Sequence, residues 1–113
     1  MRDWKKYNVW QLAHQFVLEI YNETRNFPLE ETYNLTSQLR RASSSVPTNF
    51  VEGAGRNSEA EFYRFLIIAQ GSANEVQYLL LIAKDLKYLT LNRYNELEDE
   101  IDKIKRMLFK LSN

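Results

Sequence analysis

The chain contains no cysteine, so neither a disulfide nor a thiolate metal site can form in it. Three glycines and two prolines among 113 residues leave little room for loops or linkers. This scarcity favours an all-helical chain. The absence of cysteine is compatible with the reducing cytosol, and a cytoplasmic location is what we expect.

The chain also has no net charge, because fifteen basic residues cancel fifteen acidic ones. Bulk charge therefore gives no attraction to nucleic acid or to an anionic membrane, although a local basic patch can still exist. The N-terminal residues lead into no signal-type apolar core. The most apolar run, residues 65–69, is far too short to span a bilayer. We expect no membrane partner.

A length of 113 residues fits one domain, which we assign to residues 1–113. Apolar residues recur at steps of three and four over four stretches, and this spacing predicts four helices. The first covers about residues 8–26 and the second begins near Leu29. Short connections between the four predict an all-α, up-and-down four-helix bundle.

The third and fourth helices have recognisable starts. Ser58 begins a capping box before a long third helix over about residues 59–88, and Thr90 is the expected N-cap of the fourth. The third helix carries apolar side chains on more than one face, which predicts a second covering surface and hence a homo-oligomer. Gly71 lies in a notch of small residues, for which we expect a close neighbour at residues 42–45.

The second helix is expected to kink, because Pro47 removes a backbone donor and clashes with the preceding turn. We expect the glycines of Gly53-Ala54-Gly55 to end it with a left-handed cap. One of its faces is built from short hydrogen-bonding side chains with an arginine near each end. That polar stripe consists of Gln38, Arg41, Ser45, Asn49, Glu52 and Arg56.

Two readings of the polar stripe stay open. In the first, Gln38, Arg41, Ser45, Asn49 and Glu52 form a structural network that bonds the second helix to a neighbour. In the second, arginines contact phosphate groups of a ligand. The residues predicted for nucleic-acid binding are Arg40, Arg41 and Arg56, with Lys84 and Lys87 as secondary candidates.

Catalytic and metal chemistry have little support. His14 is the only histidine and has no acid or metal ligand at helical spacing, so we expect no metal site. The serines have no base beside them to activate a nucleophile. Gly53-x-Gly55 lacks the strand and the Gly-Lys-Ser/Thr element of a phosphate loop. We therefore expect neither a cofactor nor an enzymatic activity.

Several motifs together resemble a known family. They are Phe27-Pro28-x-Glu30, Tyr33-x-Leu35-x-x-Gln38-Leu-Arg-Arg-Ala, Ser45-Val-Pro-x-Asn49, Glu52-Gly-x-Gly-Arg56 and Phe62…Phe65-Leu…Ala69-x-Gly71-Ser72…Glu75. This combination is similar to the four-helix-bundle family of 23S ribosomal RNA intervening-sequence proteins, and the similarity spans almost the whole chain.

The resemblance implies a bacterial-type helical bundle that forms a ring-shaped homo-oligomer, with a pentamer as the expected state. A related branch, the accessory variability determinant of diversity-generating retroelements, is a basic pentamer that binds a reverse transcriptase and nucleic acid. This chain departs from that branch in having no net charge. The expected partners are therefore a second copy of the chain and RNA or an RNA-handling protein. The alternative is a purely structural protein–protein interaction module without nucleic-acid binding.

Overall fold

The computed structural model describes residues 2–113 and consists of four helices and two short 3₁₀ turns. Met1, which the predicted domain includes, lies outside the described residues. The elements in chain order are η1 (Trp4–Lys6), α1 (Asn8–Thr24), η2 (Leu29–Glu31), α2 (Leu35–Ala54), α3 (Glu59–Asp85) and α4 (Leu91–Leu111).

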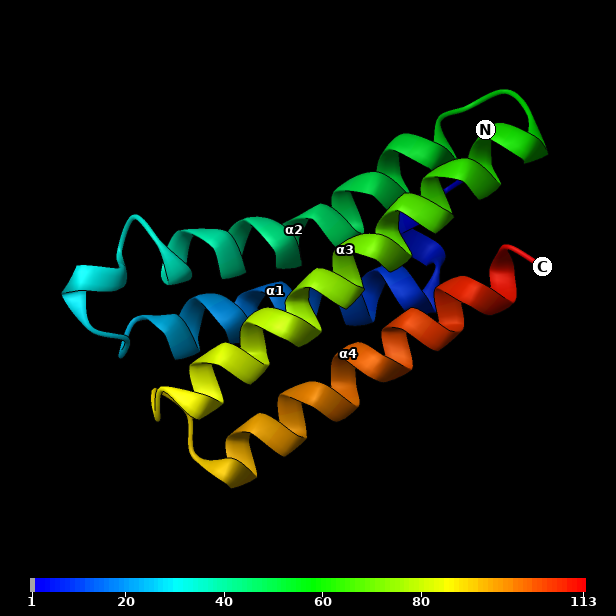
Figure 1. Ribbon diagram of the computed structural model, residues 1–113. Helices are drawn as coiled ribbons and strands as arrows, with labels where there is room; N and C mark the ends of the chain where they lie inside the picture. Colours follow the sequence, from blue (N-terminus) through cyan, green and yellow to red (C-terminus); the bar gives the residue numbers. More distant parts are fainter. Residues whose placement is uncertain (1) are drawn as a thin grey trace.

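The four helices form an up-and-down bundle that measures 43 × 24 × 20 Å (Figure 1). The α1–α2 and α3–α4 connections lie at one end of the bundle, and the α2–α3 turn lies at the other end with the C-terminus. The predicted fold class is confirmed, and residues 2–113 contain no strand.

Side-chain caps set the starts of the two C-terminal helices. The Ser58 hydroxyl accepts a hydrogen bond from the Glu61 backbone N–H at 3.1 Å. The Thr90 hydroxyl accepts one from the Arg93 N–H, also at 3.1 Å. Both predicted N-caps are confirmed, and each satisfies a backbone donor that the first helical turn leaves free.

The second helix begins later than predicted. Residues 29–31 form a 3₁₀ turn after Pro28, and α2 starts only at Leu35. The Glu31 carboxylate accepts from the Leu35 N–H at 3.3 Å, so an acidic side chain from the turn serves the start of the helix. From there α2 continues through Pro47 to Ala54.

The left-handed glycine cap predicted for α2 is wrong. Gly55 has a φ of −84°, which is right-handed, and no glycine among residues 2–113 has a positive φ. The left-handed residue is Lys87, with a φ of 65°, and it ends α3 at Asp85, before the predicted end. The Tyr88 N–H then bonds to the Ala83 carbonyl at 2.9 Å, the wrapped pattern of a Schellman ending.

The core lies along the bundle axis and receives side chains from all four helices. On α4 the predicted seam is confirmed, because Leu97, Ile101, Ile104 and Leu108 are buried and the seam's end positions, Tyr94 and Leu111, are half-buried. The most deeply buried large side chains are Phe16, Ile20, Leu39, Val46, Phe50, Leu66, Val76, Leu80, Leu97, Ile101, Ile104 and Leu108.

The outward face of α3 carries large apolar side chains that the subunit leaves uncovered, together with the polar residues Asn74 and Glu75. Ile67 is 60% exposed, Ile68 40% and Tyr78 63%. The small-residue notch that contains Gly71 does meet the predicted residues 42–45, but Gly71 itself faces away from them, because among residues 2–113 nothing lies within 4 Å of where its Cβ would be. Its neighbour Ser72 makes the contact with α2 instead, since its hydroxyl lies 2.7 Å from the Ser45 hydroxyl.

By length and composition α3 also passes as a membrane-spanning candidate, with a mean hydropathy of 1.3 over its best window and 39% of that window buried. A core helix of a packed bundle meets the same criteria, so this observation alone is weak evidence for a membrane.

Candidate functional site

A polar recess of about 460 Å³ opens between α1 and α2 near η2. Within the described part of the chain, no acidic residue lines it. Two arginines, two tyrosines and several hydroxyls converge there. We call it the arginine recess, and its lining residues are Tyr21, Thr32, Tyr33, Thr36, Ser37, Arg40, Arg41 and Ser44.

The two arginines of the recess differ in how they are held. Arg40 reaches across to α1, where its Nε donates to the Thr24 hydroxyl at 2.8 Å and its NH2 group donates to the Tyr21 carbonyl at 3.3 Å. Its guanidinium also lies 4.7 Å from the centre of the Tyr21 ring. Arg41 is exposed, and its guanidinium has no hydrogen-bond or ion-pair partner among residues 2–113. Arg41 therefore keeps all its donors available for a ligand.

Aromatic rings stand beside this free guanidinium. Tyr33 is 96% exposed at the end of η2, and Tyr21 is 40% exposed on α1. An exposed ring next to arginine donors suits a phosphorylated ligand with a planar group, because the guanidinium pairs with phosphate and the ring offers a stacking face. Such a combination contains no activated nucleophile and no acid–base pair.

The other predicted basic residues lie elsewhere. Arg56 follows the far end of α2, roughly 20 Å from Arg41 at the helical rise per residue, where it lies 4.8 Å from the centre of the Phe65 ring. Lys84 lies 5.0 Å from the centre of the Tyr94 ring, and Lys87 is exposed beyond the end of α3. The fold therefore brings Arg40 and Arg41 together and keeps the other three out of the recess.

The residues predicted for a structural network are joined only in pairs. The Asn49 amide donates to the Ser45 carbonyl at 2.8 Å and lies 3.0 Å from the Ser45 hydroxyl, which in turn meets Ser72 of α3. Gln38 instead donates to the Asn34 side chain at 3.0 Å. Glu52 is exposed and lies 3.9 Å from Arg56. The bond from α2 to α3 is thus carried by hydroxyls rather than by charges.

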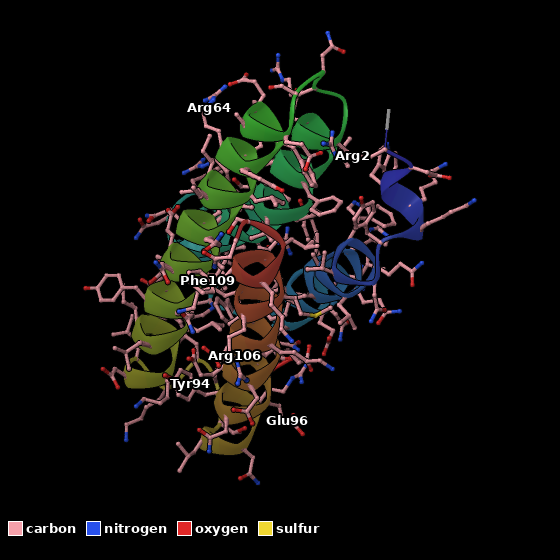
Figure 2. All side chains as sticks on the ribbon, turned by 90° about the vertical axis from the view of Figure 1, so that its right-hand side faces the viewer. Arg2, Arg64, Tyr94, Glu96, Arg106 and Phe109 are labelled. Carbon is pink, nitrogen blue, oxygen red and sulfur yellow. The ribbon has the colours of Figure 1, made fainter. Side chains whose placement is uncertain are left out.

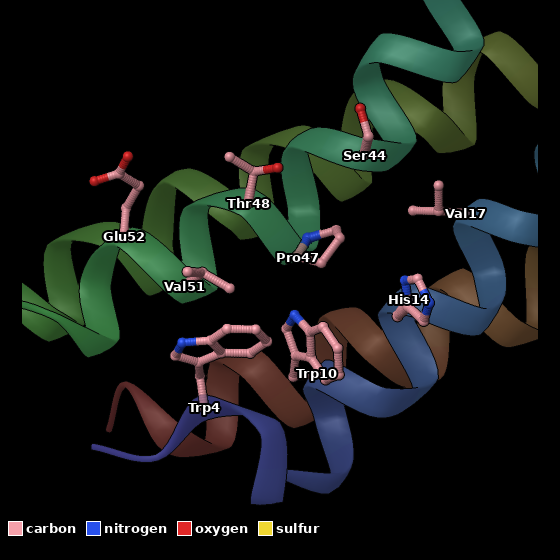
Figure 3. Close-up of a pocket in the computed structure, with 9 residues that line it drawn as sticks. All are labelled: Trp4, Trp10, His14, Val17, Ser44, Pro47, Thr48, Val51 and Glu52. Atoms are coloured by element: carbon pink, nitrogen blue, oxygen red, sulfur yellow. The ribbon is translucent and has the colours of Figure 1, made fainter. Parts of the chain in front are cut away.

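The recess continues along the same two helices into a mainly apolar groove of about 340 Å³, and Ser44 lines both. We call this part the tryptophan groove. In Figure 3, Pro47 and Val51 of α2 face the rings of Trp10 and Trp4, and Glu52 points away from the rings at the rim. Its lining residues are Trp4, Trp10, His14, Val17, Ser44, Pro47, Thr48, Val51 and Glu52.

Sequence reasoning missed this groove. It assigned no role to Trp10 and considered His14 only as a possible metal ligand. In the structure the Trp10 and His14 rings are parallel within 2°, with centroids 5.3 Å apart, and the Trp4 ring meets Trp10 edge-on at 4.7 Å. The helical spacing of Trp10, His14 and Val17 was the signal that could have pointed to it.

A second titratable cluster joins α1 to α4. The Arg93 guanidinium lies 3.0 Å from Glu19, 3.4 Å from Glu23 and 3.1 Å from Glu96. Burial, followed by a hydrogen bond to Glu19, raises the pKa of the Glu100 carboxyl to about 7. Among residues 2–113 no group of histidine and carboxylate side chains is placed to hold a metal ion. The Arg93 ion pairs with Glu19 and Glu23 connect α4 to α1.

Comparisons with known proteins agree with this fold. A family model described as 23S rRNA-intervening sequence protein matches residues 5–110. A solved structure from Bacteroides thetaiotaomicron, described as a protein of unknown function from the S23 ribosomal protein family, superposes with a TM-score of 0.84. The two chains share 24% identity, and the match covers 93% of this chain and 98% of the other. No curated protein matches the chain.

Proposed function

Because the chain belongs to the family of 23S rRNA-intervening sequence proteins, we propose that it is a self-assembling, non-enzymatic helical bundle that binds RNA through the arginine recess in the cytoplasm. The observation that carries the proposal is the free Arg41 guanidinium, which stands beside Arg40 and the exposed Tyr33 ring in a recess without a lining carboxylate. An RNA-handling protein is a further candidate partner.

The recess offers the two kinds of contact that nucleic-acid binding needs. Phosphate contacts supply most of the affinity and make it depend on salt, because each contact releases counterions. Arg41 has all its donors free for such contacts, whereas Arg40 already donates hydrogen bonds from Nε and from its NH2 group to residues of α1. The Tyr33 ring, which is 96% exposed, provides a stacking face for a base. The zero net charge of the chain limits the contacts to this local patch.

A filter-binding titration with ribosomal RNA fragments across a salt series tests the recess. Arg40→Ala combined with Arg41→Ala should weaken binding. On single-stranded RNA it should also reduce the slope of log K against log[salt] by about 0.7 for each phosphate contact that is lost. The matched control is Arg64→Ala combined with Arg106→Ala, which removes the same charge from α3 and α4. Both control arginines project from those helices in Figure 2.

Equal loss with both pairs would mean that RNA responds only to overall charge, and no loss with either pair would remove the recess from the binding site. Arg64 and Arg106 lie in exposed ion pairs with Glu61 and Asp102, at 3.2 Å and 3.1 Å. Exposed pairs of this kind contribute little to stability, so the control should fold normally.

Self-assembly is proposed through the outward face of α3. Ile67, Ile68 and Tyr78 expose apolar side chains on that face, with Asn74 and Glu75 between the isoleucines and the tyrosine, and the open position at Gly71 allows another helix to approach closely. A glycine in mid-helix costs about 0.5–1 kcal/mol, which a close intersubunit contact would offset. Light scattering should give a mass near five times the 13.5 kDa subunit for the pentamer that the family resemblance implies. A monomer would contradict this part of the proposal.

The competing function is an interaction module that does not bind nucleic acid. The contacts of Arg40 with α1 and of Ser45 with Ser72 favour it, because they use part of the polar stripe inside the fold. A flat RNA titration together with intact assembly would support this alternative.

A further inference from the structure

The arginine recess and the tryptophan groove form one continuous track along α1 and α2. Ser44 lines both, so no other element separates them. The track runs from the exposed Tyr33 ring past Arg41 to the Trp10 and Trp4 rings. Its two ends differ in chemistry, because one carries guanidinium groups and the other carries indole rings.

We infer that the tryptophan groove is a second subsite for the same ligand and takes an unpaired base of a single-stranded RNA whose phosphates contact the arginine recess. The inference rests on the proposed function and adds to it the class of RNA that is bound. Indole rings are good stacking platforms for any base, because every base has a π-face. In a duplex the base faces are already stacked on one another and are not available to side chains.

Distances along α2 fit a short single strand. Thr48 and Glu52, which lie at the tryptophan groove, are roughly 10–16 Å from Arg41 at the helical rise per residue. An extended strand of a few nucleotides covers that distance and lies within the length that single-strand-binding surfaces contact.

The charge at the groove favours a base over a phosphate at this end. The Glu52 carboxylate stands at the rim, where it repels phosphate, and Arg56 at 3.9 Å balances it only partly. Below the rim the lining is apolar, with Pro47 and Val51 opposite the indole rings (Figure 3). The Lys5 ammonium lies 5.3 Å from the centre of the Trp4 ring, so a cation is present only at the outer end of the groove, and a phosphate placed against the apolar lining would still lose hydration. The strand would therefore place its phosphates at Arg41 and a base at Trp10.

Tryptophan fluorescence, excited at the long-wavelength edge where tyrosine absorbs little, reports on this groove alone, because Trp4 and Trp10 are the only two tryptophans of the chain and both line it. Titration with single-stranded hexa-adenylate should quench this fluorescence, and a blunt-ended duplex long enough to stay paired under the assay conditions should not. Trp10→Leu should weaken hexamer binding by about 5- to 100-fold, the range expected for the loss of one stacked base. The salt dependence of that variant should match the unchanged protein, since no phosphate contact is removed.

Trp10→Phe is the conservative variant and should restore most of the affinity, because it keeps an aromatic face. Phe109→Leu is the matched control. It replaces an aromatic residue of α4 that is 58% exposed and lies outside the track, and it should bind as the unchanged protein does. Circular dichroism of each variant verifies folding, and Trp4→Leu replaces Trp10→Leu if the latter does not fold.

The outcomes separate the inference from the proposed function. Suppose that the hexamer binds with normal salt dependence, does not change the tryptophan fluorescence of the unchanged protein, and binds Trp10→Leu with the same affinity. The inference is then overturned and the arginine recess stands. If the hexamer quenches the tryptophans while the Arg40 and Arg41 variant binds normally, the recess fails and the groove stands. Fluorescence that responds to dilution of the protein but not to RNA would make the groove a protein contact and overturn the inference.

Discussion

The outward sides of α3 and α4 differ in kind, although the two helices pack side by side in the same bundle. On α4 the central seam of Leu97, Ile101, Ile104 and Leu108 is fully covered, and the outward side is mainly charged, with Leu91 and Phe109 as exposed apolar residues near the two ends. On α3 the inner side is buried just as well, yet Ile67 and Tyr78 stand in solvent on the outer side. One subunit thus covers the apolar seam of α4 and leaves apolar side chains in the middle of α3 exposed, which is the surface that we propose for self-assembly.

Substitution of two adjacent residues on α3 should give the clearest test of this difference. Leu66 is fully buried and Ile67 is 60% exposed. Leu66→Ala should lower the free energy of unfolding by about 2–5 kcal/mol, because it leaves a cavity in the core. Ile67→Ala should change the stability of the isolated subunit by less than about 0.5 kcal/mol. Urea denaturation of both variants under dilute conditions measures the two effects.

Light scattering tests whether the exposed position on α3 takes part in assembly. Ile67→Lys should reduce the assembled mass, because a charge would be buried at the proposed subunit contact. A control substitution on α4, Lys103→Ala, should leave the mass unchanged. Assembly that survives Ile67→Lys would mean that the outer face of α3 is not the contact.

The surroundings of two glycines, Gly53 and Gly71, show the same difference between covered and uncovered surfaces. A Cβ at Gly53 would lie 2.6 Å from the Phe65 Cβ, whereas at Gly71 it would meet nothing within 4 Å among residues 2–113. Gly53→Ala should therefore destabilise the subunit by about 1–3 kcal/mol through overpacking of α2 against α3. Gly71→Ala should stabilise the isolated subunit by about 0.5–1 kcal/mol, because alanine is the better helix former. Thermal unfolding midpoints that move in the same direction for both variants would contradict this assignment.

The smallest effect concerns the charged side of α4. Burial and the hydrogen bond to Glu19 raise the pKa of Glu100 to about 7 from 4.5. At pH values between 4.5 and about 7, the Glu100 carboxyl keeps a proton in the folded protein that the unfolded chain has released. The free energy of unfolding should therefore fall as pH rises through this range. Solvent screening limits the change to about 1 kcal/mol.

Urea midpoints measured across this pH range test the effect, with Glu100→Gln as the comparison. The amide cannot ionise, so the variant should lose this part of the pH dependence. Glu98, whose pKa burial also raises, is unchanged in both proteins and cancels in the comparison. An identical pH profile for the two proteins would show that the Glu100 carboxyl does not hold its proton in the fold.

Much of the fold could be predicted because its signals are local. The caps at Ser58 and Thr90 and the seam of α4 depend on residues within one or two turns, and the structure confirms them. The errors arose where contacts between elements decide the conformation. The start of α2 depends on a turn after Pro28, and the close approach at the end of α2 is at Gly53, which faces Phe65 of α3.

The candidate site shows the same division. Arg40 and Arg41 could be singled out from their position on or beside a polar stripe, but no sequence pattern separates them from Arg56, Lys84 and Lys87. That separation follows from the length of α2 and from the α1 contacts that hold Arg40. The tryptophan groove requires η1, α1 and α2 to meet, and helical periodicity within one segment carries no information about such a meeting.

By itself the sequence determined that this protein is an all-helical bundle with more apolar surface on α3 than one layer of neighbours needs, because composition and spacing along each helix set both properties. Only the tertiary structure decided which residues share a groove, which arginine keeps its donors free and which glycine faces a close neighbour. These depend on side chains far apart in the chain, whose distances are set when the helices pack.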